Sequence, residues 1–525
     1  MKKILTYLII GAVAVGAVSC KKLDINDNPN SPTSATPGLV LPQAITATAA
    51  LSQTYNSTFY YPGGFMANVY GFGAYGASVS LNYTTLSFDG VWRTSYDNLT
   101  DYQYVVDNTS GDATLVYSNS IARIMKSFVF SKLVDNFNNV PYSEALKGNM
   151  LLTPKYDNAA DIYKDLVAQL NASITAINAG QAGTSTASVI SSGDPMFAGD
   201  MNKWKQFANT LKLRLLIKMA GVADLTSFTT PEFAAFDNTI GVITDDAIVN
   251  PGYQKQSGRV NPLYRSIGSD ENNTRVATSN LPSTWIYSFY NGTKLTDPGR
   301  GSVVFRLFPN TATNQLGQEN LPSTIVPPAG STAWFTGADY NTPGLGAVKG
   351  PSQGQVLVLN AEAKFLQAEA YARGYMTGSA ATAFNDGITA SFTYLFKNQA
   401  GTVDASKNVA TAVSTYQTQN GESRLVNFAL ATTPAQQVEA IITQKYIAMN
   451  VINCDEAFAE FRRTTYPAIS GNSPTSTFAS IQSASTSPDK LITRLPYASS
   501  EYSLNPSNVP QNVNFFTAKI FWDVN

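Results

Sequence analysis

The fold class is decided by the stretch Asn158-Ala-Ala-Asp-Ile-Tyr-Lys-Asp-Leu-Val-Ala-Gln-Leu-Asn-Ala-Ser-Ile-Thr-Ala-Ile177. Its apolar side chains recur every three or four residues, as on one face of a helix: Ile162, Leu166, Leu170, Ile174 and Ile177. Asn158 is a favoured N-cap residue, and Asp161 stands three positions later, as in a capping box. We therefore predict an amphipathic helix over 158–177.

The same helical spacing recurs on both sides of this stretch. The further predicted helices cover 119–137, 203–220, 360–373, 379–396, 433–450 and 455–463. Thr433-Pro-Ala-Gln436 is a second capping box, with proline at the first helical position. Short turns join many of these helices in pairs, a pattern typical of stacked helix–turn–helix repeats, although the sequence contains no clean repeat. The pattern predicts a mainly α fold.

Long stretches without this spacing separate the helices. Residues 52–92, 221–357 and 464–525 are rich in Gly, Pro, Ser, Thr, Asn and aromatic residues. Loops of this kind on a rigid frame commonly carry binding sites. No linker separates two cores, so we predict one domain over 39–525.

The N-terminus has the three parts of an export signal. Lys2 and Lys3 precede an uncharged apolar stretch over 4–18, which ends in Ala17-Val-Ser-Cys20. The cysteine stands where a lipoprotein signal places the residue that becomes lipid-modified. We predict that residues 1–19 are removed, that Cys20 carries the lipid, and that the polar segment 20–38 is a flexible tether. An ordinary secretory signal with an incidental cysteine is the alternative.

The composition excludes several classes of function. Removal of Lys2 and Lys3 reduces the 35 basic residues to 33, against 36 acidic residues, which argues against a nucleic-acid binder. The chain has no histidine, so Ser-His-Asp catalysis, Cys-His catalysis and His-ligated zinc are excluded. No cofactor and no metal site are predicted. Cys454 is the one cysteine besides Cys20, so two non-lipidated cysteines are not available for a disulfide.

Two short motifs resemble ligand-binding loops, but their surrounding sequence does not support that function. Residues 71–76 match G-x-G-x-x-G, but an extended-looking stretch follows instead of a helix, so we predict a loop. The polar run from Asp24 lacks the glycine and glutamate of a calcium loop.

Five glutamates lie on or beside the predicted helices. A pair of such carboxylates would suit a glycoside hydrolase, whereas structural ion pairs on helix surfaces are the preferred interpretation. These carboxylates are Glu144, Glu362, Glu369, Glu456 and Glu460.

Aromatic residues in the loop-like stretches are the ligand-binding candidates. Tyrosine and tryptophan rings offer apolar faces with a polar edge, which suits the C–H faces of sugars. The candidates are Tyr75, Tyr83, Trp285, Trp334 and Tyr340. The alternative is that such rings pack the loops onto the helices, and a structural role of this kind is predicted for Trp92, Trp204 and Trp522.

Several segments together resemble the SusD/RagB family of outer-membrane nutrient-binding lipoproteins, and its second large branch in particular. They include Asn26-Asp-Asn-Pro-Asn30, Asp135-Asn-Phe-Asn-Asn-Val-Pro-Tyr-Ser-Glu-Ala-Leu146, Lys203-Trp-Lys-Gln-Phe-Ala-Asn-Thr-Leu-Lys-Leu-Arg214, Phe365-Leu-Gln-Ala-Glu-Ala-Tyr-Ala-Arg-Gly374 and Arg462-Arg463-Thr-Thr-Tyr-Pro467. The segments follow the family's order along the chain. One departure is Asn136-Phe-Asn-Asn-Val, where the family often has Tyr-Gly-Asp-Val.

The resemblance implies a scaffold of tetratricopeptide-like helical hairpins with long irregular loops. It also implies a non-catalytic lipoprotein, exposed at the cell surface on the outer membrane, that captures an oligosaccharide or peptide. The implied partner is a SusC-like TonB-dependent transporter, which receives the ligand. A lipid-anchored glycoside hydrolase is the competing hypothesis.

Overall fold

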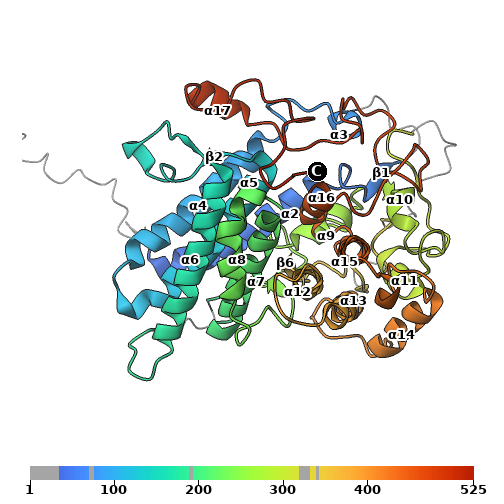
Figure 1. Ribbon diagram of the computed structural model, residues 1–525, viewed down its shortest axis with the longest axis horizontal. Helices are drawn as coiled ribbons and strands as arrows, with labels where there is room; N and C mark the ends of the chain where they lie inside the picture. Colours follow the sequence, from blue (N-terminus) through green and yellow to red (C-terminus); the bar gives the residue numbers. More distant parts are fainter. Residues whose placement is uncertain (1–34, 70–75, 189–192, 319–331, 338–341) are drawn as a thin grey trace, which may run out of the picture.

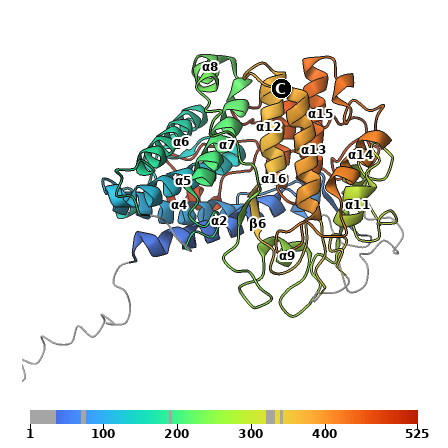
Figure 2. The same cartoon turned by 90° about the horizontal axis from the view of Figure 1, so that it is seen from below.

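The computed structural model describes residues 35–69, 76–188, 193–318, 332–337 and 342–525, and its framework is a series of long helices (Figure 1). The first group is α2 (Pro37–Thr58), α4 (Asp89–Thr109), α5 (Val116–Phe137), α6 (Ala159–Gly180) and α7 (Met201–Ala220). The second group is α12 (Asn360–Ala372), α13 (Ala380–Phe396), α14 (Val409–Gln419), α15 (Pro434–Ala448) and α16 (Cys454–Thr464). Helices α4, α5 and α6 lie on one side of Figure 2, and α12, α13 and α15 lie on the other.

Local capping sets where the predicted helices begin. The Asn158 side chain accepts hydrogen bonds from the Ala160 and Asp161 amides at the start of α6. Asp161 pairs with Lys164 at 3.0 Å, so the predicted capping box has only its Asn158 half in the structure. Both halves of the box are present at Thr433, at the start of α15.

Helices α2 and α4 occupy parts of the chain where no helix was predicted. Residues 52–58 of the predicted loop over 52–92 therefore form the end of α2, and residues 89–92 form the start of α4. Most turns of α2 are covered by other elements, including α4, α5 and α16, so its sequence shows no clear apolar stripe. Residues 77–80, predicted to be extended, form the short helix α3 (Ala77–Ser80).

Short elements fill the remaining segments. Three two-stranded antiparallel sheets pair β1 (Met66–Asn68) with β5 (Asn280–Pro282), β2 (Val140–Pro141) with β3 (Tyr156–Asp157), and β4 (Ala247–Val249) with β6 (Gln355–Val358). The short helices are α8 (Thr226–Ala234), α9 (Pro262–Ile267), α10 (Thr284–Tyr287), α11 (Pro298–Val304) and α17 (Ser499–Leu504). The stretches predicted to be loops over 221–357 and 464–525 thus contain some regular structure.

At the turn between α5 and β2, asparagine stands at a position whose backbone favours glycine. Asn138 has φ +63° and ψ −116°. Its amide donates to the Val134 carbonyl oxygen at 2.9 Å, and its Oδ1 accepts from the Phe521 amide at 2.8 Å, so the turn is held by contacts on both sides.

The hydrophobic core is largely one cluster, which extends from Leu41 to Trp522. It includes Trp92, Trp204 and Trp522, each at most 3% exposed, which confirms their predicted structural role. Core contacts thus join the helices to the C-terminal segment, and the irregular segments are held on the helical frame.

Candidate ligand-binding site

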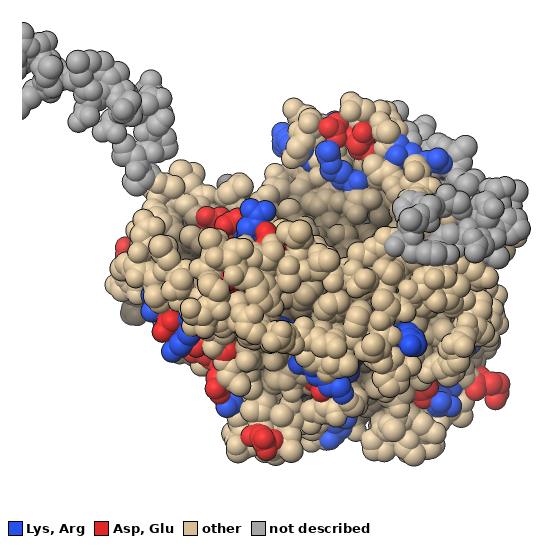
Figure 3. Space-filling view, turned by 90° about the horizontal axis from the view of Figure 1, so that it is seen from above, with Lys and Arg blue, Asp and Glu red and all other residues tan. Residues whose placement is uncertain are grey.

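The irregular segment after α16 covers one face of the helical frame. It crosses the upper side of Figure 1 together with α3 and α17. Seen from above, this face is hollowed, and the charged side chains gather on the surrounding surface rather than in the hollow (Figure 3). A hollow with few charges suits a ligand that is polar but uncharged.

One pocket of about 570 Å³ forms where two distant segments of the chain meet. The Ile481 amide donates to the Leu316 carbonyl oxygen at 3.1 Å and joins these segments. Gly317 has φ +87°, and a Cβ at this position would lie 2.6 Å from Ser480 Oγ, so the close approach requires glycine. The polar side chains in the lining include Gln315, Asn472, Ser480, Asp489 and Lys490. They offer hydrogen-bond donors and acceptors to a hydroxyl-rich ligand.

A second pocket of about 520 Å³ adjoins the first. Phe461, Ile492 and Phe516 give it an apolar part, and Lys519 and Asp523 give it a polar part. Lys519 Nζ lies 3.7 Å from Asp523 Oδ1. Burial raises the pKa of the Asp523 carboxyl, and the positive charge of Lys519 acts against this rise. The pocket thus combines an apolar surface with an ion pair at its edge.

Pro488 and Asp489 line both pockets and form the wall between them. Internal hydrogen bonds hold this wall in shape. Ser487 Oγ donates to Asp489 Oδ1 at 2.6 Å, and the Leu491 amide donates to the same oxygen at 3.0 Å. Ser483 Oγ donates to the Lys490 carbonyl oxygen at 2.6 Å. Because its serines are bonded within the loop, the wall presents Asp489 and Lys490 from a preorganised backbone.

Arg462 supports the second pocket from the protein interior. Its guanidinium donates to the carbonyl oxygens of Thr493 at 2.8 Å and Asp135 at 3.0 Å. The guanidinium carbon also lies 5.1 Å from the ring centroids of both Phe458 and Trp522. Burial lowers the pKa of Arg462 to about 10, so the side chain stays positive at neutral pH. Arg462 thereby joins the pocket to α5.

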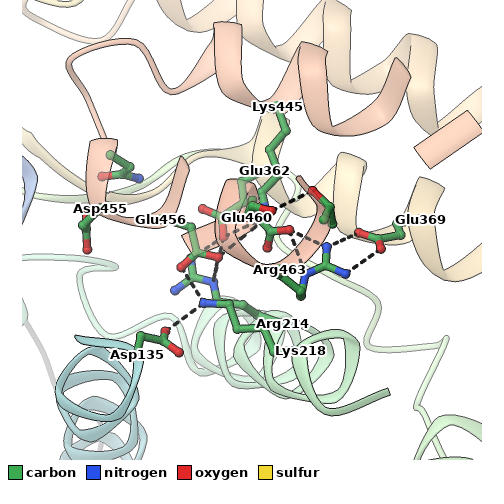
Figure 4. A network of polar contacts seen from close by, with 12 residues as sticks. Asp135, Arg214, Lys218, Glu362, Glu369, Lys445, Asp455, Glu456, Glu460 and Arg463 are labelled. Atoms are coloured by element: carbon green, nitrogen blue, oxygen red, sulfur yellow. Dashed lines mark hydrogen bonds and ion pairs between the residues drawn. The ribbon is translucent and has the colours of Figure 1, made fainter. Parts of the chain in front are cut away.

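The carboxylates that were weighed as a catalytic pair belong to an ion-pair network inside the protein (Figure 4). Glu456 lies 2.8 Å from Lys218, Glu362 accepts from Arg214 at 2.7 Å, Glu460 lies 3.1 Å from Lys445, and Glu369 lies 2.6 Å from Arg463. Glu144 lies 3.6 Å from Lys155 nearer the surface. The predicted ion pairs are confirmed.

The predicted surface location of these pairs is wrong for all four network glutamates, which are at most 5% exposed. Arg463 is also buried, because α16 packs against α2 and α15. Burial raises the pKa of Glu369, but the guanidiniums of Arg463 and Arg373 outweigh this effect and lower it to about 2. The four network carboxylates therefore face buried cations and are not presented to a ligand.

Three of the five predicted ligand-binding aromatic residues are buried. Trp285 packs against Phe289 and Phe478 with ring centroids 5.5 Å away, and its exposed fraction is 1%. Trp334 is 0% exposed, and Tyr83 is 9% exposed beside Phe88. These rings pack loops onto the core, as in the alternative interpretation, and their faces are not available for stacking on a sugar. Tyr75 and Tyr340 lie outside the described residues, as does Cys20.

The sequence pointed to the segment 464–525 as a whole but not to the polar residues of the two pockets. Asn472, Asp489, Lys490, Lys519 and Asp523 belong to no motif. The signal that was present is the density of serine, proline and asparagine around them, which indicates turns. That signal does not tell which side chains face a pocket.

Helical hairpins that carry a hollowed face of irregular loops define a ligand-binding scaffold. A SusD-like family model, described as "starch-binding associating with outer membrane", matches residues 29–497. The chain therefore belongs to the SusD-like family. Members of this family are binding proteins without catalytic activity, so the chain is not an enzyme, and the glycoside hydrolase hypothesis is wrong.

Solved structures agree with this fold. A SusD homologue from Bacteroides uniformis is 22% identical, with a TM-score of 0.68 and coverage of 93% of this chain and 99% of the other. A chitin-binding protein is 24% identical, with a TM-score of 0.67 and coverage of 93% and 100%. A chitin-binding SusD homologue from Flavobacterium johnsoniae is 21% identical, with a TM-score of 0.66 and coverage of 92% and 99%. Among curated proteins, none matches.

The described residues offer neither a cluster of metal ligands nor a membrane-spanning helix. In the described part of the chain, no three His, Cys, Asp or Glu side chains are grouped in a way that suits a metal ion. None of the helices in the described ranges has the length and apolar character that crossing a bilayer requires.

Proposed function

We propose that this protein is a lipid-anchored outer-membrane component that captures an oligosaccharide and delivers it to a SusC-like TonB-dependent transporter. The observation that carries the proposal is the pair of adjoining pockets, which combine hydrogen-bonding side chains with an apolar part, on a SusD-like frame. Solved relatives described as chitin-binding make chito-oligosaccharides the first ligands to test. A peptide is the second candidate, because hydrogen-bonding groups in the pockets suit peptide amides as well as hydroxyls.

Calorimetry with chito-oligosaccharides, malto-oligosaccharides and short peptides tests the ligand class. We expect one glycan series to bind. We expect Asp489→Ala to weaken its binding about tenfold, or roughly 1.4 kcal/mol, because the substitution removes a lining carboxylate and the acceptor that holds the wall in shape. Glu422→Ala is the matched control, because Glu422 lines a separate pocket beside Lys294 and Ser423. Equal affinity of Asp489→Ala and the unsubstituted protein would remove these pockets from the proposal.

The transporter partner is tested by gentle solubilisation and co-purification. A TonB-dependent barrel should accompany the protein, and Cys20→Ala should release the protein from the membrane and abolish ligand uptake while leaving the fold intact. Uptake that persists with a soluble, unlipidated protein would refute the role of the anchor. Purification without any barrel would refute the delivery step.

A further inference from the structure

Four large apolar side chains are exposed together at one corner of the molecule. Leu86, Met150, Leu152 and Leu504 have exposed fractions of 73%, 85%, 73% and 73%. We call these four residues the apolar corner. Isolated exposed leucines are common on soluble proteins, whereas a group of them at one place marks a contact surface.

Hydrogen bonds around α17 bring the four residues to the same corner. The Ser499 amide, at the start of α17, donates to the Thr85 carbonyl oxygen at 3.0 Å, next to Leu86. At the other end of α17, Asn505 Nδ2 donates to the Pro154 carbonyl oxygen at 2.8 Å, close in sequence to Leu152. Helix α17 and the loop between β2 and β3 lie close together at the upper left of Figure 1. Three segments far apart in the sequence therefore contribute to one surface.

We propose that the apolar corner inserts into the lipid surface to which the protein is anchored and so fixes the orientation of the binding face. The proposal rests on the lipid anchor of the proposed function. Lys147 and Lys155 flank Met150 and Leu152 in the sequence and are exposed, although Lys155 also lies 3.6 Å from Glu144. This arrangement suits a membrane interface, because lysine ammonium groups reach the headgroups while apolar side chains enter the acyl region.

The position of the anchor is compatible with this contact. The Tyr104 hydroxyl donates to the Ala35 carbonyl oxygen, so the chain enters the structure beside the last turns of α4. Asp89, the first residue of α4, accepts from the Ser500 amide of α17 at 2.9 Å. Tyr104 and Asp89 are 15 residues apart, which is roughly 22 Å along a helix. The 15 residues from Cys20 to Ala35 span at most roughly 50 Å, so the lipid and the corner reach one bilayer surface.

Fluorescent probes on the lipidated full-length protein test the proposal. Leu504→Cys and Met150→Cys each receive an environment-sensitive nitrobenzoxadiazole probe, and the protein is reconstituted on vesicles of phosphatidylethanolamine and phosphatidylglycerol. Cys454 is 0% exposed and does not compete for the label. Leu430→Cys is the matched control, because Leu430 is exposed near α13 on the opposite side of the molecule. We expect several-fold brighter emission, quenched by doxyl lipids, for the corner probes and not for the control.

The possible results distinguish a failure of the membrane contact at the apolar corner from a failure of the lipid anchor. Protein that sediments with vesicles while both corner probes stay exposed to water would overturn the inference and leave the anchor intact. Protein that does not bind vesicles at all would refute both. Corner probes that brighten only after a barrel transporter is added would assign the corner to a protein partner and overturn the membrane contact.

Discussion

The substitution Glu369→Gln tests whether the buried ion pairs stabilise the helical frame. Glu369 is 1% exposed and accepts from Arg463 Nη1 at 2.8 Å, Arg463 Nη2 at 2.6 Å and Arg373 Nε at 2.7 Å. Glutamine keeps the shape of the side chain but removes its charge. The two guanidiniums lower the pKa of Glu369 from its ordinary 4.5 to about 2 against the effect of burial. At about 1.4 kcal/mol per pKa unit, the charge contributes about 3 kcal/mol to the free energy of unfolding at pH 7.

The pH dependence follows from the direction of this change. A carboxyl whose pKa is lower in the folded state stabilises the protein fully above pH 4.5, and this stabilisation is lost as the pH falls toward 2. Urea denaturation should therefore show a loss of about 3 kcal/mol for Glu369→Gln at pH 7 and a smaller difference from the unsubstituted protein in acid. Glu439→Gln is the control, because Glu439 pairs at 2.7 Å with the half-exposed Arg424 and should cost under about 1 kcal/mol. Glu369→Gln with unchanged stability at pH 7 would refute the reasoning.

Three more outcomes are expected. Trp285→Ala should lower the free energy of unfolding by about 3–5 kcal/mol in thermal or urea denaturation, because its ring is 1% exposed; a loss of ligand binding with unchanged stability would contradict this. Burial lowers the pKa of Lys349 from 10.5 to about 7. Between pH 7 and 10.5 the unfolded chain therefore binds more protons than the folded protein, so the free energy of unfolding rises with pH. Lys349→Met should flatten that rise in urea titrations at several pH values, and an unchanged slope would contradict the role of Lys349. Tyr75→Ala and Tyr340→Ala should each weaken glycan binding several-fold in calorimetry at unchanged stability, and full affinity in both would exclude sugar stacking there.

Local sequence signals predicted the helices that have one apolar face and a clear cap. Helices α6 and α15 are examples, because Asn158 and Thr433 fix their first turns within the local sequence. Helix α2 was missed because it is covered on several sides, and α4 was missed because its many Asp, Asn, Thr and Ser residues resemble a loop. Periodicity detects a boundary between core and solvent, which α2 lacks. Helix α4 has one buried face, but Ser95, Asn98 and Thr109 on that face are polar and weaken the apolar pattern.

The pockets depended on contacts that no local pattern contains. Gln315 and Asp489 line the same pocket although they are far apart in the sequence. The pairing of glutamates with cations was predictable, because acidic and basic residues stand close together between Glu456 and Arg463. The burial of these residues depends on how α16 packs against α2 and α15. Aromatic rings in loops were ambiguous for the same reason, since Trp285 faces the core through contacts with the distant Phe478.

The wall formed by Pro488 and Asp489 has a thermodynamic consequence for the two pockets. A ligand that shifts this wall while filling one pocket changes the shape of the other, so the two occupancies are linked. Such linkage is reciprocal. If a ligand in the first pocket changes the affinity of the second pocket by some factor, a ligand in the second pocket changes the affinity of the first by the same factor. A chain long enough to cross the wall would fill both pockets as one molecule, so affinity would rise steeply at that length and change little between shorter chains.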